Sequence, residues 1–301
     1  MNRPAPRSID QYLSQLRDAL KGEDPALIQD ALYDAEEYLR AELGQHPGKS
    51  EADVLELIAS TYGAPDEVAE AYRTTEKTVR AALKPTPPRE RSSALGRFFA
   101  VYSDSRSWMA FFYMLLSLVT GIFYFTVTVA GLSISAGLGL LIIGIPFFLL
   151  FIGFTRVLSL VEGRIVEGLL GVRMPRRPVR SPSGVPFLSR ISAMLLDPRT
   201  WTTLLYLLLM LPLGVLYFAV AIVIFALSFG FIVAPFAHLL HVLGLSSGGI
   251  QFDGWYAPWP ATVPLALLGV LLLTAFLHLA RGIGSLHGEL ARALLLSRDP
   301  E

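Results

Sequence analysis

The sequence alternates between amphipathic and uniformly apolar stretches, and this contrast predicts two kinds of helix. Between residues 8 and 80, apolar side chains recur every three or four positions, the spacing of a helix with one buried face. From Trp108 to Thr155 the chain carries no Asp, Glu, Lys, Arg or His. A helix needs roughly 20 apolar residues to cross a bilayer. We therefore expect this stretch to form a helical hairpin in a membrane, with its turn at the Gly/Ser cluster of residues 131–139.

The N-terminal part is expected to contain four short amphipathic helices. Each start has a recognisable capping signal: Ser8 with Gln11, Asp24 with Pro25, Ser50 with Asp53, and Pro65 with Asp66 and Glu67. Gly63 is placed to end the third helix. The fold class that follows is all-α, with a small helical bundle joined to a polytopic membrane domain.

The formal net charge of zero conceals a strong division along the chain. Residues 8–76 hold 16 Asp/Glu and 5 Lys/Arg, a net charge of −11, so the rest of the chain carries +11. No cysteine is present, which excludes disulfides and thiolate metal sites. The first residues lack the apolar core of a signal peptide, so we expect the acidic head to stay on the side where it is made.

The head resembles the HAAS domain, a helical bacterial signalling domain, over about residues 8–80. The resemblance lies in the segments YLSQLRDAL, DALYDAEEYLRAEL and IASTYGAPDEVAEAYR, in which Tyr62 and Gly63 precede a proline-led acidic helix. It implies a cytoplasmic helical module fused to membrane segments, in stress or transcription-linked signalling systems, without catalytic activity.

A stiff, polar, Pro-rich segment, KPTPPRER at residues 84–91, separates the head from the membrane part. We expect an acidic head at 8–82, a linker at 83–92 and a sensor-like transmembrane domain at 93–301.

The membrane part contains a direct repeat. A shift of 93 positions superimposes these pairs: Arg97 and Arg190, Asp104 and Asp197, Arg106 and Arg199, Trp108 and Trp201, Tyr113 and Tyr206, Gly121 and Gly214, Tyr124 and Tyr217. After the hairpins the register resumes at a shift of 125, which places Arg156 on Arg281 and Gly163 on Gly288. We expect repeat one at 93–175 and repeat two at 186–297. Each has two crossings, so the copies point the same way. Each copy is also expected to end in a separate amphipathic helix that lies on the inner leaflet.

The arginines predict the orientation. They lie between the copies and after the second one: Arg156, Arg164, Arg173, Arg176, Arg177, Arg180, Arg190 and Arg199, then Arg281, Arg292 and Arg298. The expected far-side loops, 130–139 and 244–261, contain no Lys or Arg. By the positive-inside rule we expect four spans, near 108–130, 138–158, 201–227 and 262–280, with both termini cytoplasmic. The expected location is the bacterial cytoplasmic (inner) membrane.

The second copy holds 32 extra residues, mainly between its crossings. Residues 231–243 form an apolar run in which Pro235, His238 and His241 are the exceptions. The aromatic stretch SSGGIQFDGWYAPWP follows, where Trp and Tyr favour the interface. The pattern leaves open whether 231–261 is re-entrant, a short interfacial helix or an extracytoplasmic loop.

The membrane part resembles the sensor domain that precedes kinase modules in many bacterial signalling proteins. The resemblance covers about residues 95–297, through the two D-x-R-x-W motifs, YMLLSLVTGIFYF, YLLLMLPLGVLYF and VEGRIVEGLLGVRMP. It implies signal perception. No room for a phosphotransfer domain follows Gly288, so output is expected to pass through the head or a separate partner.

The most prominent candidate residues mark where the chain enters the membrane: Asp104, Arg106 and Trp108, and Asp197, Arg199 and Trp201. An acid and an arginine two positions apart do not face each other on a helix. We interpret Asp as a helix N-cap, Arg as a headgroup contact and Trp as an interface anchor, with ligand binding as the alternative.

A second set of candidate sensing residues comprises His238, His241, Asp253, Trp255 and His278. The paired histidines favour metal binding or pH sensing, but with Asp253 alone as a third ligand the metal site is incomplete. For His278, the alternative to a sensing role is an ordinary structural position at the membrane interface.

Our functional hypothesis is a membrane-embedded sensor that passes an envelope or bilayer signal to a cytoplasmic partner through its acidic head. The candidate head-docking residues are Arg173, Arg176, Arg177 and Arg180. The alternative is a transport-associated or permease-partner subunit. No catalytic, cofactor or metal motif is evident, so we expect no enzyme. The expected partners are the lipid bilayer, a signalling or regulatory protein and other copies of the chain, without direct nucleic-acid contact.

Overall fold

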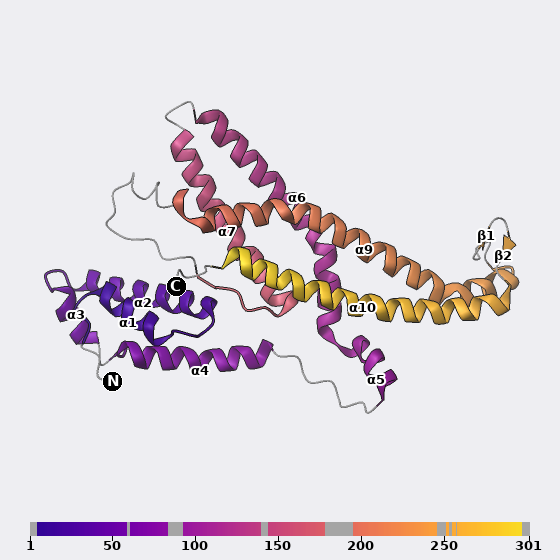
Figure 1. The fold of residues 1–301 in the computed structure, drawn as a ribbon, viewed down its shortest axis with the longest axis horizontal. Helices are drawn as coiled ribbons and strands as arrows, with labels where there is room; N and C mark the ends of the chain where they lie inside the picture. Colours follow the sequence, from indigo (N-terminus) through magenta and orange to yellow (C-terminus); the bar gives the residue numbers. More distant parts are fainter. Residues whose placement is uncertain are drawn as a thin grey trace. The chain divides into compact units, whose positions relative to one another are not determined.

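A computed structural model describes residues 5–58, 61–83, 93–139, 144–177, 195–245, 251–252, 255–256 and 258–296. The fold is all-α, as predicted. Within these residues, the strands are limited to the two-residue pieces β1 (Gln251–Phe252) and β2 (Trp255–Tyr256), which pair antiparallel. The helices are labelled in Figure 1.

The head contains the four predicted helices: α1 (Ile9–Ala19), α2 (Pro25–Gln45), α3 (Glu51–Ile58) and α4 (Pro65–Leu83). Their starts have the expected caps. Ser8 Oγ accepts from the N–H of Gln11 at 3.2 Å, and Asp24 Oδ1 accepts from the N–H of Ala26 at 2.9 Å. Each cap satisfies an N–H group that the first turn of a helix leaves without a partner.

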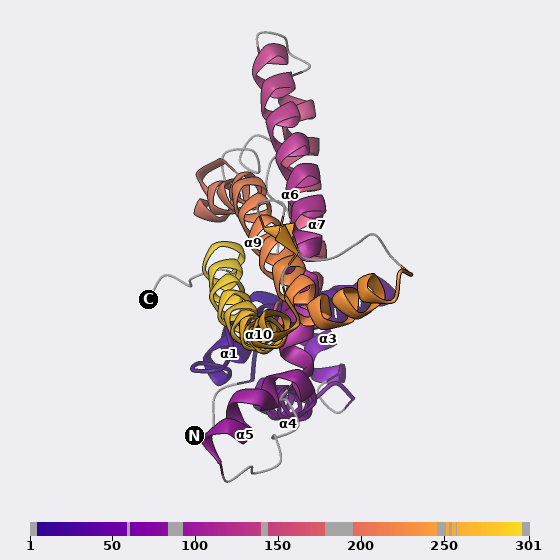
Figure 2. The same cartoon turned by 90° about the vertical axis from the view of Figure 1, so that its right-hand side faces the viewer.

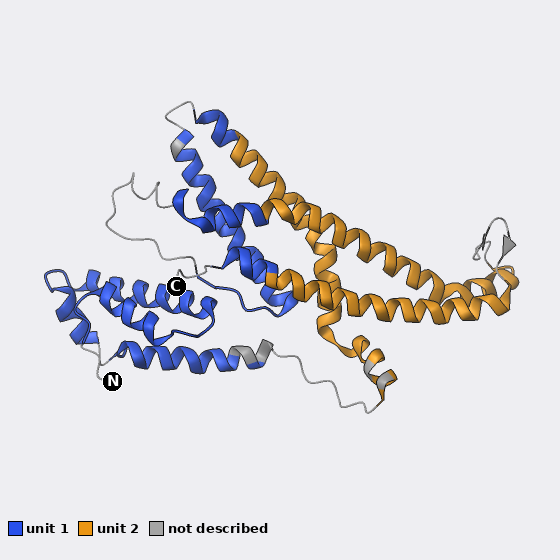
Figure 3. Cartoon of the chain, viewed as in Figure 1, with its two compact units in different colours: residues 1–84, 134–206, 290–301 blue, residues 85–133, 207–289 orange. Residues whose placement is uncertain are grey.

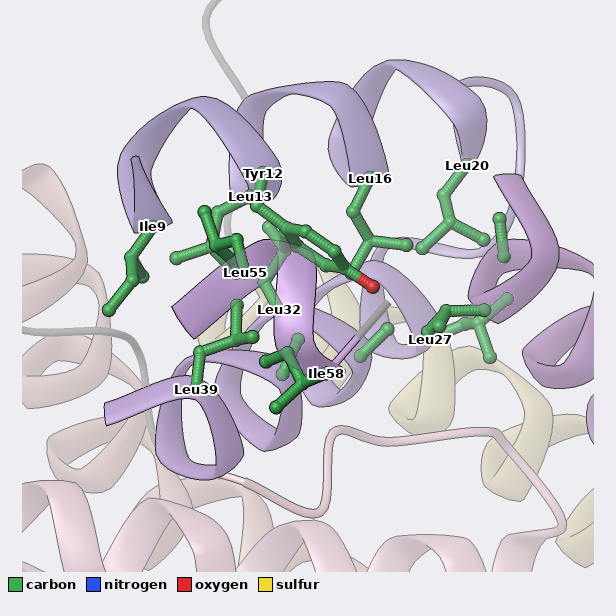
Figure 4. Packing of buried hydrophobic residues seen from close by; sticks show 14 residues of the cluster. Ile9, Tyr12, Leu13, Leu16, Leu20, Leu27, Leu32, Leu39, Leu55 and Ile58 are labelled. Carbon is green, nitrogen blue, oxygen red and sulfur yellow. The ribbon is translucent and has the colours of Figure 1, made fainter. Parts of the chain in front are cut away.

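The apolar faces of α1 to α4 form a closed hydrophobic core (Figure 4). Leu16 and Leu20 are fully buried there, and Tyr12 is 4% exposed. The Tyr12 hydroxyl donates to the carbonyl of Gly63 at 2.9 Å. Gly63 has φ +98°, which only glycine adopts at little strain, so it sets the turn between α3 and α4.

The membrane part begins with α5 (Ala94–Phe99) and the short 3-10 helix η1 (Ala100–Ser103). Four long helices follow: α6 (Ser105–Leu138), α7 (Gly144–Leu170), α9 (Pro198–Val242) and α10 (Trp259–Leu295). In the part of the chain that the structure describes, three helices, α6, α9 and α10, are long and apolar enough to cross a membrane. These helices indicate a membrane protein. The predicted second span lies on α7, which is not among the three, so four spans remain a prediction.

The first predicted turn was placed too early. Helix α6 continues through Gly131, Ser133 and Ser135 to Leu138. Weak helix formers continue a helix when the alternative is a backbone without hydrogen-bond partners in an apolar environment. The low helix propensity of these glycine and serine residues therefore did not end α6.

In the second copy, the apolar run that follows the predicted third span is helical. Helix α9 runs for 45 residues, with Pro212 and Pro235 inside it, and contains His238 and His241. Residues 231–242 are thus helix rather than a loop or a re-entrant turn. At about 1.5 Å per residue, α9 is about 68 Å long, far more than the roughly 30 Å of a hydrocarbon core. The extra residues of the second copy therefore lengthen its helical hairpin.

The trailing segments of the two copies were expected as separate amphipathic helices on the inner leaflet. Instead they continue the preceding apolar helices without a break, as far as Leu170 in α7 and Leu295 in α10. Each copy consequently ends in a long rigid helix that carries its apolar part and its charged part together.

The chain divides into two compact units, shown in Figure 3. Unit 1 comprises residues 1–84, 134–206 and 290–301, and unit 2 comprises residues 85–133 and 207–289. Unit 1 thus holds the head together with α7, the segment after α7 and the start of α9. The predicted boundaries between head, linker and membrane domain remain predictions.

Within unit 2, α6 and α9 cross at two glycines that the repeat makes equivalent. A Cβ at Gly121 would lie 2.4 Å from the carbonyl oxygen of Met210, and one at Gly214 would lie 2.2 Å from that of Ser117. Ser117 and Met210 are also 93 positions apart. The two helix backbones therefore come into contact at two equivalent places, Gly121 of α6 against Met210 of α9 and Gly214 of α9 against Ser117 of α6.

The α9 and α10 parts of unit 2 run side by side toward β1 and β2 (Figures 1 and 2). Their contact is also close, because a Cβ at Gly269 would lie 2.7 Å from the carbonyl oxygen of Ser228. Small residues again allow two apolar helices to approach.

Candidate functional site

The candidate site lies in unit 1, where the head meets the segment that follows α7. Helix α7 ends at Leu170, and Gly171, with φ +70°, turns the chain out of it. The N–H of Gly171 donates to the carbonyl of Glu167 at 3.1 Å, which closes the last turn. We call residues 171–177 the arginine strap.

Arg173 is the centre of the strap. Its guanidinium reaches two carboxylates of the head, Asp30 on α2 at 3.0 Å and Glu76 on α4 at 3.2 Å. It also reaches Glu167 on α7 at 3.3 Å. The Arg173 side chain is 9% exposed, and the three carboxylate side chains are 4–8% exposed. One buried guanidinium thus joins two head helices to a helix of the membrane part.

Asp30 is held by more than the guanidinium. Its Oδ1 accepts hydrogen bonds from the backbone N–H groups of Arg176 at 2.6 Å and Arg177 at 2.8 Å. Burial raises the pKa of Asp30 above its usual value, and these two N–H groups and Arg173 offset part of that rise. For Arg173, burial lowers the pKa, but attraction to Asp30, Glu76 and Glu167 outweighs it, so the pKa is raised.

The outer part of the strap makes weaker, more exposed contacts with α2. Arg177 Nε lies 2.7 Å from Asp34 Oδ1, and its guanidinium carbon lies 5.5 Å from the centre of the Tyr33 ring. The Gln29 side chain donates to the carbonyl of Arg177 at 2.6 Å. Arg176 reaches back to Glu167 at 3.2 Å rather than to the head.

Three of the four candidate docking arginines therefore belong to one described segment, and Arg173 and Arg177 pair with head carboxylates. Arg180 lies outside the described residues. A further contact, which the sequence did not single out, joins Arg292 near the end of α10 to Asp24 at 2.8 Å. The charge division indicated that basic residues outside the head could pair with head acids, but it did not indicate that Arg292 pairs with Asp24.

Both D-x-R-x-W motifs have the same local geometry. Asp104 Oδ1 accepts from the N–H of Arg106 at 3.1 Å, and Asp197 Oδ1 accepts from that of Arg199 at 3.0 Å. Trp108 and Trp201 each donate their indole N–H to a carbonyl six residues earlier, on Tyr102 at 3.1 Å and on Leu195 at 2.9 Å. This is the N-cap arrangement that the spacing favoured. Their position at a membrane surface remains a prediction.

The two copies exchange partners through these motifs. In unit 2, Arg281 lies 3.2 Å from Asp104, and in unit 1, Arg156 lies 3.7 Å from Asp197. Arg156 and Arg281 are equivalent in the repeat. The aspartate that starts one copy is therefore paired with the arginine near the end of the other copy.

A buried polar pair follows the same rule. In unit 2, the Tyr113 hydroxyl lies 2.6 Å from His287 Nε2, and in unit 1, the Tyr206 hydroxyl donates to Glu162 Oε1 at 3.0 Å. Glu162 and His287 are 125 positions apart and are 0% and 1% exposed. Neither residue was predicted as a site residue. Each is a polar residue directly before a repeated glycine, Gly163 or Gly288, and this position was a usable signal.

The candidate sensing residues are dispersed. His238 packs against Trp259, with ring centroids 5.9 Å apart, and His278 stacks on Phe98 and approaches its carbonyl at 3.0 Å. Asp253 lies outside the described residues, and the structure describes only the backbone of Trp255. No group of three His, Asp or Glu side chains placed to hold a metal occurs among the residues described.

A family model described as "Putative sensor" matches residues 113–295. The chain belongs to this sensor family. The matched region includes both tyrosines of the exchanged pairs, Glu162, His287 and the arginine strap. Comparisons with curated proteins and with solved structures gave no match.

Membership of the sensor family and the helical membrane-type fold point to a protein that is not an enzyme. The family match begins after the head. The resemblance of residues 8–80 to the HAAS domain therefore remains a prediction.

Proposed function

We propose that this protein is a four-span sensor of the bacterial cytoplasmic membrane that signals by releasing its acidic head from the arginine strap. In the docked form, Asp30 and Glu76 are covered by Arg173. In the released form, the same carboxylates face solvent and bind a basic surface on a cytoplasmic partner. Both termini and the strap lie on the cytoplasmic side in this scheme, with α7 as the second span.

The contact of Arg173 with both Asp30 and Glu76 carries the proposal. Buried ion pairs are poor sources of net stability, because desolvation offsets most of the attraction. They do fix one arrangement over others, since removing a single partner leaves an uncompensated buried charge. A buried ion pair of this kind can therefore hold the head against the strap in one defined arrangement and can also be released.

The strap is well placed to respond to the membrane part. It follows α7 directly, and Glu167 on α7 contributes to the same cluster as the head carboxylates. A rotation or shift of α7 changes the position of Glu167 relative to Arg173. A signal that favours one position of α7 then shifts the populations of docked and released head.

Limited trypsin cleavage of the full chain in proteoliposomes tests the proposal. The linker carries trypsin sites after Arg89 and Arg91, whereas the bond after Lys84 precedes a proline and is not cut. Arg173→Gln is expected to speed release of the head fragment at least severalfold, because it removes the buried cation that Asp30 and Glu76 share. Replacing Arg176 and Arg177 by Gln as well should speed it further.

The matched control is Arg164→Gln. Arg164 is an exposed arginine of α7, and its ion pair, with Glu167 at 2.8 Å, lies within α7. Its cleavage rate should stay at the wild-type value. Equal rates for wild type and Arg173→Gln would disprove release as the output.

A further inference from the structure

Unit 1 contains a cavity of about 570 Å³ beside the arginine strap. Its walls come from α2 of the head, from α7, from Met174 and Pro175 of the strap, and from the first turns of α9. Sites for small molecules commonly measure about 300–1,000 Å³. The cavity is therefore large enough for a ligand that touches the head and the membrane part together.

One side of the cavity is apolar. Ile152 and Leu160 of α7 line it together with Met174, and Ile152 and Met174 are each 1% exposed. Thr155 and Thr203 add side chains that are 2% and 8% exposed. This side has the chemistry to cover hydrocarbon.

The other side carries three cations and three anions: Arg40, Arg156, Arg199, Glu36, Glu37 and Asp197. Arg156 lies 3.7 Å from Asp197, an ion pair longer than a hydrogen bond. Glu36 lies 2.7 Å from Arg40 on the head wall. The formal charge of the lining is balanced, with the arginines Arg156 and Arg199 on the membrane-part wall and the glutamates on the head wall.

The depth of the cavity in the bilayer follows from its lining. Arg156 is the first charged residue after the apolar run that begins at Trp108, and Arg199 precedes Trp201 by two positions. Arginine and tryptophan in these places mark the headgroup level of a membrane. Ile152 is one helical turn before Arg156, toward the hydrocarbon. A polar rim at headgroup level and an apolar floor below it match the two halves of a lipid.

We propose that this cavity binds one phospholipid whose headgroup carries both a phosphate and a primary amine. Arg156 and Arg199 hold the phosphate, Glu36 and Glu37 receive the ammonium group, and the first carbons of an acyl chain lie along Ile152 and Leu160. Guanidinium groups bind phosphate through paired, charge-assisted hydrogen bonds. An anionic headgroup without an amine would add an uncompensated negative charge to a lining whose own formal charges balance, so the lining favours the zwitterion.

Such a lipid also stabilises the docked head, because it contacts α2 on one side and α7 and α9 on the other. This regulatory step rests on the proposed function, whereas binding of the lipid does not. Anything that binds only the docked form shifts the population toward it. The class of signal that follows is the supply of this lipid in the inner leaflet.

Binding is measured with acyl-labelled phosphatidylethanolamine added to the full chain in dodecyl maltoside micelles. We expect saturable binding of one lipid, and about tenfold weaker binding for Arg156→Gln/Arg199→Gln. The repeat supplies the control, because Arg281→Gln/Arg106→Gln changes the equivalent arginines, which do not line the cavity. The control should bind within about twofold of wild type. Equal loss in both double variants would show lipid binding to the protein surface in general and would overturn the site.

A second variant keeps the test valid if the arginine variant fails to fold. Glu36→Gln/Glu37→Gln should retain phosphatidylglycerol binding while losing the preference for phosphatidylethanolamine. An unchanged preference would overturn the assignment of the amine. Competition by phosphoethanolamine as strong as by the whole lipid would overturn the lipid and indicate a soluble ligand.

Trypsin cleavage of the same samples separates the two proposals. Added phosphatidylethanolamine should slow cleavage of the linker in wild type and not in Arg156→Gln/Arg199→Gln. If Arg173→Gln speeds cleavage but the cavity variants bind lipid normally, the lipid site is wrong and head release stands. If the lipid binds as expected but Arg173→Gln leaves cleavage unchanged, head release is wrong and the site stands.

Discussion

The hydroxyl of Tyr206 donates a 3.0 Å hydrogen bond to Oε1 of Glu162, a carboxyl group with no exposed surface. Tyr113, the equivalent tyrosine of the first copy, meets His287 of the second copy in the same way. Each copy thus supplies the hydroxyl that the buried polar residue of the other copy needs. Each of these two contacts therefore joins a residue of one copy to a residue of the other.

The first prediction concerns these hydroxyls. Tyr206→Phe and Tyr113→Phe each remove a hydrogen-bond partner from a buried polar side chain, at a cost of about 1–3 kcal/mol in unfolding free energy. Thermal unfolding of the purified chain in detergent should show a lower midpoint for both. Val119→Ala, at a position with 64% of the side chain exposed, is the control and should change the midpoint little. Unaltered midpoints in both tyrosine variants would contradict the importance of the exchanged pairs.

The second prediction concerns the crossing of α6 and α9. Gly121→Ala and Gly214→Ala place a methyl group 2.4 Å and 2.2 Å from a backbone carbonyl oxygen, closer than any real contact. The helices must separate, which costs about 1–3 kcal/mol or more. Size-exclusion chromatography and thermal unfolding should show less folded protein for both variants. Gly230→Ala lies in open space on the same helix and should behave as wild type; a comparable loss there would point to helix flexibility instead of the crossing.

The third prediction separates the charge of Asp30 from its role as a hydrogen-bond acceptor. Asp30→Asn keeps an oxygen for the N–H groups of Arg176 and Arg177, whereas Asp30→Ala leaves both N–H groups unpaired, at about 1–3 kcal/mol for each one left buried. Linker cleavage should therefore be faster in the Ala variant than in the Asn variant. The exposed Asp18→Ala provides the baseline. Equally fast cleavage of both variants would mean that attraction to Arg173, which both lose, rather than the backbone contacts, holds the strap.

The fourth prediction is a pH dependence of docking. Burial raises the pKa of Asp30 in the docked form above its usual value. The docked form therefore takes up a proton at a pH where the released head has not yet done so, and docking gains from Asp30 as the pH falls through that window. Above the window this contribution is absent.

Mild acid should consequently leave the head docked, while high salt weakens the exposed contacts of the strap. Cleavage rates measured with an acid-stable protease, at pH values from neutral down to that window, check this. Faster cleavage on mild acidification of wild type, absent in Asp30→Asn, would contradict the direction of the shift.

The arginine strap shows how far the sequence could lead toward the site. The charge division and the cluster at 173–180 were sufficient to predict that arginines after the first hairpin face the acidic head. They were not sufficient to select Arg173 over its neighbours, or to identify Asp30 and Glu76 among 16 acids. That choice depends on the φ of Gly171 and on how α2 and α4 pack, neither of which is local in sequence.

Glu162 and His287 illustrate a different limit. Each is a single polar residue in an amphipathic stretch, where a solvated position is the usual interpretation. Only the exchange of partners between copies buries them, and an alignment of the repeat does not say whether a copy pairs with itself or with the other.

The sequence by itself determined the all-α fold, the four capped helices of the head, the apolar character of the membrane part and its internal repeat. These follow from short-range causes: helical periodicity, capping side chains and the length of uncharged runs. The tertiary structure decided where the long helices end, which residues cross the copies, and which arginine is buried against the head. Those outcomes depend on contacts between residues far apart in the chain, which select one buried ion pair among the many that the charges allow.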